Sequence, residues 1–142
     1  MIALSDVRPR AAAVLEPATD ADPQVIGLTD AVQAPCVQIS IAQPWLTPTP
    51  QAPAYFYRVQ VLAIGGRVEA SGALDDLEDL AVYVCTRFAL DALPWSALEI
   101  SAPRGLDIGG VSYLVSRFVW QVPCDATKPR AELPLEVIAH AG

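Results

Sequence analysis

Proline is the feature that most constrains how this chain can fold. A proline lacks the backbone N–H group and fixes φ, so it interrupts helices and is excluded from the interior of a sheet. The 142-residue chain has 13 prolines, and four of them fall between residues 44 and 53. We therefore expect residues 43–53 to form an extended connecting loop that contains Trp45, and neither a helix nor a central strand.

Two segments with the pattern of half-buried strands flank this loop. Residues 36–41 and residues 55–64 both alternate between apolar and polar side chains. We expect the two segments to pair as an antiparallel hairpin with a long loop. Residues 17–35 contain three prolines and are expected to be mostly loop, with a short strand at residues 24–28.

Residues 72–93 carry the clearest helix pattern, because apolar side chains recur every three or four positions along them. Ser71 is the expected cap, and Pro94 is expected to end the helix. The first turns hold four acids, where the helix dipole favours negative charge: Asp75, Asp76, Glu78 and Asp79. A shorter amphipathic helix is expected at residues 5–16, with Ser5 as its cap.

Two more strands are expected after the long helix, at residues 98–101 and 111–122. The second is apolar on both faces, which indicates that both faces are covered. We expect the long helix to cover one face of this strand, and a neighbouring subunit is a candidate to cover the other. Glycine pairs at residues 65–66 and 109–110 are expected to supply positive φ at strand ends.

This order of elements predicts an α+β fold. We expect a mostly antiparallel four-stranded sheet, with one long helix and a short N-terminal helix packed on one face. Residues 1–123 would form this domain, and residues 124–142 a proline-containing C-terminal arm. Leu133, Leu135 and Val137 alternate in the arm, so part of it could add as a strand to a sheet edge.

Charge and hydropathy limit the partners. The net charge of −7 argues against tight binding to nucleic acid phosphates. Apolar residues make up 53 % of the chain, and the mean hydropathy is +0.35, so we expect some apolar surface to serve partners. The sequence has no apolar stretch typical of a signal peptide or a membrane span, which predicts a soluble intracellular protein without a membrane partner.

The residue types that carry catalysis are sparse. Cys36, Cys85 and Cys124 lie far apart and predict neither a disulfide framework nor a zinc site; the first two are expected in the core. His140 is the single histidine and follows a proline-containing tail, where a general base is poorly held. The acids at 75–79 match no metal motif, so we interpret them as a solvated helix start. We expect no catalytic residue, no cofactor and no metal, and thus no enzyme.

The segment around Trp45 admits three interpretations. Residues 44–50 could be a polyproline ligand for an aromatic groove, a stiff arm that reaches a neighbouring subunit, or a rigid loop whose tryptophan covers the edge of the core.

Three stretches, in this order, resemble the tail terminator proteins of long-tailed bacteriophages, especially those of phages that infect actinobacteria. Residues 34–48 run from a strand into the segment PWLTP. Residues 57–67 end in Gly-Gly-Arg and are followed by the helix up to Leu93. Residues 99–114 lead through Gly-Gly into the last strand. The similarity covers residues 1–123 and leaves out the tail.

The resemblance implies a structural virion protein at the head–tail junction, present in the host cytoplasm during assembly. Such proteins form a ring, here expected to be a homo-hexamer, that caps the tail tube and ends its polymerisation. The implied partners are the major tail tube protein and the head-completion or stopper protein, with DNA passing through the channel without specific binding.

The residues that would serve this role are apolar or acidic. The expected subunit and partner contacts are Trp45, Leu46, Pro48, Tyr55, Tyr113, Phe118, Trp120, Leu133 and Leu135. The expected channel-facing acids are Asp75, Asp76, Glu78 and Asp79. The alternatives are another head–tail connector or stopper protein, a small ligand-binding α+β domain with a pocket beside Trp45, and a peptide-binding adaptor.

Overall fold

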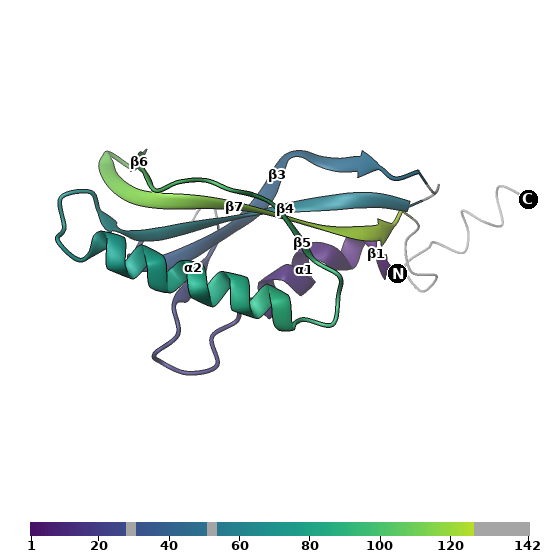
Figure 1. The fold of residues 1–142 in the computed structure, drawn as a ribbon, viewed down its shortest axis with the longest axis horizontal. Coiled ribbons are helices and arrows are strands. Elements are labelled where there is room, and N and C mark those ends of the chain that lie inside the picture. Colours follow the sequence, from purple (N-terminus) through teal and green to yellow (C-terminus); the bar gives the residue numbers. More distant parts are fainter. Residues whose placement is uncertain (28–30, 51–53, 127–142) are drawn as a thin grey trace, which may run out of the picture.

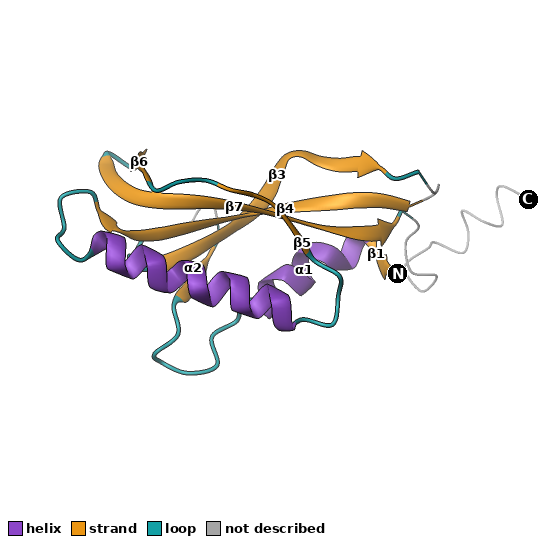
Figure 2. Ribbon diagram, viewed as in Figure 1, coloured by secondary structure: helices purple, strands orange, loops and turns teal. Residues whose placement is uncertain are grey.

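The computed structural model describes residues 1–27, 31–50 and 54–126 of the chain. In these residues two helices pack on one face of a curled sheet, as Figure 1 and Figure 2 show. The elements are β1 (Ile2–Ala3), α1 (Leu4–Val14), β2 (Gln24–Ile26), β3 (Cys36–Pro48), β4 (Ala54–Arg67), α2 (Ala73–Leu90), β5 (Ser96–Ile100), β6 (Arg104–Ile108) and β7 (Val111–Asp125).

The two long strands β4 and β7 form the centre of the sheet and pair antiparallel over almost their whole length. On one side, β3 pairs antiparallel with β4, which confirms the predicted hairpin, and β2 pairs parallel with β3. On the other side, β6, β5 and β1 pair one after another with the outer edge of β7. β5 and β6 run antiparallel to β7, and β1 runs parallel to it.

The predicted four-stranded, mostly antiparallel sheet is wrong. Within the described residues, the sheet has seven strands of mixed orientation and curls into a half-barrel. The sequence pattern missed β1 because two residues are too short to alternate. It missed β6 because the segment Arg-Gly-Leu-Asp-Ile places a glycine and two charges where a strand pattern would require apolar or β-branched residues.

The predicted loop at residues 43–53 is also wrong over its first half. β3 continues to Pro48, and Leu46, Thr47 and Pro48 pair with β4 after a register shift that follows Ile41. β2 covers only the first three residues of β3, so this second half is an edge among the described residues. A proline is tolerated there because an edge strand has backbone N–H groups that need no ladder partner.

Both helices lie near their predicted positions, but their ends differ. Ala3 and Gly72 occupy the positions before the first turns, and neither helix has a side-chain cap, so the caps predicted at Ser5 and Ser71 are wrong. α2 ends at Leu90, earlier than Pro94. The next residue, Asp91, is extended, and its carboxylate accepts the N–H of Leu93.

The main core fills the space between the helices and the sheet. Phe88 of α2 is 1 % exposed, stacks on Trp120 with ring centroids 4.5 Å apart, and meets Trp95 edge-on at 4.9 Å. Gly65 of β4 allows this close packing, because a Cβ atom there would lie 2.9 Å from the Leu77 Cβ. Gly65 does not adopt positive φ, whereas Gly109 and Gly110 do, at 60° and 84°.

A second, smaller core lies on the opposite face of the sheet. Consecutive residues of a strand point to opposite faces; accordingly Val61 belongs to the main core and Leu62 to the second one. The second core consists of Ile26, Cys36, Leu62, Ile64 and Val115. The chain itself therefore covers part of both faces of β7.

Candidate interaction surface

The segment around Trp45 forms the outer part of the β3 edge. The Trp45 ring meets Tyr57 edge-on with centroids 5.3 Å apart, and 37 % of the residue remains exposed. Ile41, on the same strand, is 40 % exposed. Trp45 thus covers the edge of the main core and at the same time offers apolar surface. Among the other residues predicted for contacts in this hairpin, Pro48 is exposed, and Leu46 and Tyr55 are half-buried.

Further exposed apolar residues lie on α2 and on β5. Val82 and Leu90 of α2 are 67 % and 78 % exposed, and Leu98 and Ile100 of β5 are 45 % and 52 % exposed. We call these four residues the α2–β5 surface. None of the four is among the contact residues predicted from the sequence. For the two α2 residues a signal was available, because Val82 and Leu90 fall outside the apolar stripe that faces the sheet.

One edge of β5 is bonded to β7, so the opposite edge is the one that could contact a partner. Arg117 of β7 forms an ion pair with Glu99 at 2.6 Å. The hydroxyl of Ser116 donates to the Ser101 carbonyl at 2.7 Å, and the Arg117 N–H donates to the Ser101 hydroxyl at 2.8 Å. In the described part of the chain, no strand pairs with the other edge of β5.

β7 contributes little to the surface, although three of its residues were expected to make contacts. Phe118 and Trp120 are 1 % and 6 % exposed in the main core, because their side of β7 faces the helices. Tyr113 is half-buried against the second core. We leave Phe118 and Trp120 out of any proposed interface. The predicted contacts at Leu133 and Leu135 lie outside the described residues.

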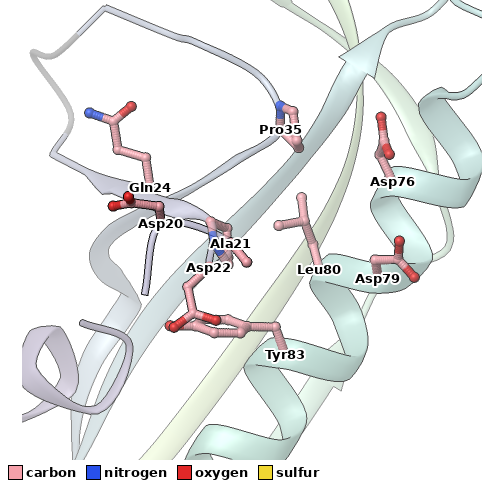
Figure 3. Close-up of a pocket in the computed structure, with 10 residues that line it drawn as sticks. Asp20, Ala21, Asp22, Gln24, Pro35, Asp76, Asp79, Leu80 and Tyr83 are labelled. Carbon is pink, nitrogen blue, oxygen red and sulfur yellow. The ribbon is translucent and has the colours of Figure 1, made fainter. Parts of the chain in front are cut away.

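The four acids of α2 are all exposed, and two of them border a hollow with acids from the preceding loop. Asp76 and Asp79 lie on the α2 side, and Asp20 and Asp22 come from the loop before β2. Figure 3 shows these side chains around the hollow, which has a volume of about 390 Å³. The loop acids were not predicted, since nothing in their spacing links them to α2.

Asp22 fastens its loop to α2. The carboxylate accepts hydrogen bonds from the N–H groups of Ala18 and Thr19, at 2.8 and 3.1 Å, and from Arg87 at 3.3 Å. The Ala18 hydrogen bond is the largest influence on its pKa, and the net effect lowers that pKa. The Tyr83 hydroxyl donates to the Leu15 carbonyl at 2.9 Å, and burial raises the pKa of Tyr83. These hydrogen bonds join the loop before β2 and the end of α1 to α2.

Within residues 1–27, 31–50 and 54–126, no group of three or more His, Cys, Asp or Glu side chains is arranged to hold a metal ion. Cys36 and Cys124 are buried, and burial raises the pKa of both thiols; Cys85 is half-buried. Neither described helix is both long and apolar enough to cross a membrane.

Comparisons with known proteins do not assign this chain to a group. No protein-family model matches it, and no curated protein matches it.

Proposed function

We propose that this chain is a structural subunit that assembles with copies of itself into a ring, and that the ring caps a bacteriophage tail tube as a tail terminator. The support is the ordered resemblance in residues 34–48, 57–67 and 99–114, together with the exposed apolar surface. The observation that carries the assembly argument is the placement of that surface on two opposite edges of one sheet.

A ring needs two different patches on each subunit, because every contact joins one surface to another in a head-to-tail manner. Ile41 and Trp45 lie on the β3 side of the sheet, and Leu98 and Ile100 lie on the β5 side, with β4 and β7 between them. One edge of a subunit can therefore contact the other edge of the next subunit without using the same residues twice.

Negative charge suits the proposed conduit. The chain carries a net charge of −7, and two of the four exposed acids of α2, Asp76 and Asp79, border a hollow together with the loop acids Asp20 and Asp22. Repulsion between these acids and phosphate would let DNA pass without being retained. We propose that Asp75, Asp76, Glu78 and Asp79 face the channel.

Tube-capping experiments test the proposal. Tail tube protein from the same phage is polymerised with and without this chain, and the tubes are measured by electron microscopy. We expect a ring at one tube end and arrested growth in its presence. Tubes of unchanged length with bare ends would contradict the terminator role, and binding to the head-side protein alone would favour a connector.

Matched lysine substitutions connect the capping activity to the α2–β5 surface. Leu90→Lys places a cation at the C-terminal end of α2, which the helix dipole tolerates, so the fold is expected to survive. We expect this variant to lose tube capping. Ala13→Lys makes the same change in charge at an exposed position of α1 and should cap as the wild type does.

A further inference from the structure

Two adjoining hollows form an apolar groove at the end of the sheet where the chain begins. One has a volume of about 340 Å³ and lies beside Ala54 and Phe56; the other has about 600 Å³ and lies beside Leu93 and Pro94. Met1 and Pro123 line both, and Met1 is 77 % exposed. We call these two hollows the end groove. Its lining is almost entirely apolar, which is costly to leave in water.

The described chain leaves the sheet at this groove. Cys124 pairs with Ile2 and Tyr55, and Asp125 pairs with Ala3 and Ala54. Figure 1 shows the N-terminus beside the end of β7. Ala126, the last described residue, is therefore only three positions past a residue that lines both hollows.

The sequence that follows has the pattern of a groove ligand. Leu133, Leu135 and Val137 alternate with Pro134 and Glu136, so an extended backbone places the three apolar side chains on one side. Seven residue steps separate Ala126 from Leu133, and a chain of that length spans at most about 24 Å. Because Pro123, which lines both hollows, is three residues before Ala126, this length of chain is enough for the segment to return to the groove.

We propose that residues 133–137 dock in the end groove of their own chain, with the leucine and valine side chains against Met1, Phe56 and Pro123. Tethering favours this occupant, because a short linker holds the segment near the groove at an effective concentration on the order of millimolar. A free partner of similar affinity would have to exceed that concentration to displace it. The proposal does not depend on ring assembly.

Hydrogen exchange of the full-length protein, followed by mass spectrometry, tests the docking. In the wild type we expect the amides of Leu133, Leu135, Glu136 and Val137 to exchange at least about tenfold more slowly than in the double variant Leu133→Ser/Leu135→Ser. Residues 54–57 should exchange faster in that variant. The matched control Glu136→Ser changes the opposite side of the segment and should leave the protection unchanged. Exchange of the wild-type segment at the rate of an unstructured peptide would overturn the proposal.

Two substitutions in the groove locate the binding site. Phe56→Ser and Pro94→Asp change different hollows, and Pro94 is exposed, so the second variant is expected to fold even if the first does not. If either folded variant loses the protection at residues 133–137, the result supports the proposal. If the protection persists in Pro94→Asp and in a folded Phe56→Ser, the result contradicts it. Protection that rises with protein concentration would show binding to a second copy and would overturn docking within one chain.

Discussion

The two faces of the sheet are built from the same strands but hold very different cores. On the helix-covered face, Phe88 and Phe118 are fully buried beneath α2, together with residues of α1. On the opposite face, a smaller core consists of five buried residues of the described chain, among them Leu62 and Ile64. The comparison indicates that helix packing provides most of the stability, while the edges and the outer side of α2 remain available for contacts.

The largest effect is expected from Phe88→Ala, which removes the ring between Trp95 and Trp120. Truncating a buried phenylalanine costs about 3–5 kcal/mol, so the free energy of unfolding should fall by that amount in urea denaturation. Val82→Ala on the same helix is the control, because a residue that is 67 % exposed should change stability by less than about 0.5 kcal/mol. Equal losses would contradict the account of this face.

A pair of leucine truncations compares the two cores directly. Leu77 lies in the main core and Leu62 in the second core, with 2 % and 5 % exposure. Truncations of this kind cost about 2–5 kcal/mol, depending on how far the site can collapse. We expect Leu77→Ala near the upper end of that range and Leu62→Ala near the lower end, by chemical denaturation. The reverse order would mean that the smaller core is the more tightly packed one.

The contact between β4 and α2 is tested by two neighbouring glycines. In Gly65→Ala the new Cβ would lie 2.9 Å from the Leu77 Cβ and would also meet the Ala73 carbonyl oxygen, so the helix must move. Overpacking of this kind costs about 1–3 kcal/mol. In Gly66→Ala the nearest atom is the Ala73 Cβ at 3.4 Å, and thermal unfolding should show a clearly smaller loss.

A smaller, pH-dependent effect is expected at Asp91. Its carboxylate accepts hydrogen bonds from Arg10 and from the Trp95 indole, each at 2.8 Å. Burial acts to raise the pKa of Asp91, but these hydrogen bonds outweigh it, and the pKa is lowered. Asp91→Asn should cost about 1 kcal/mol at neutral pH.

The pH dependence follows from the sign of that shift. A carboxyl group whose pKa is lowered by folding contributes stability above its unfolded pKa, and this contribution is lost as the pH falls through the lowered value. The difference in unfolding free energy between the wild type and Asp91→Asn should therefore be constant above the ordinary pKa of 3.8 and shrink below it. A difference that grows on acidification would contradict the role given to this carboxylate.

The sequence could predict the elements whose pattern is long enough to repeat. The apolar stripe located α2, and the alternation of β4 and the start of β3 predicted their antiparallel pairing. The sequence pattern could not predict β1 and β6. It also could not predict that β3 would continue through Pro44 and Pro48. These features depend on which edges of the sheet stay unpaired. The predicted contacts stay a prediction at Trp45, which is exposed, whereas Phe118 and Trp120 are buried in the main core beneath α2.

The solution mass of the full-length chain, measured by sedimentation velocity with and without tail tubes, tests the central claim most directly. We expect an assembly of six 15.1 kDa chains, free or on the tube. Leu90→Lys should abolish it, and Ala13→Lys should leave it intact. A chain that stays monomeric at high concentration and also fails to sediment with tubes would contradict the account.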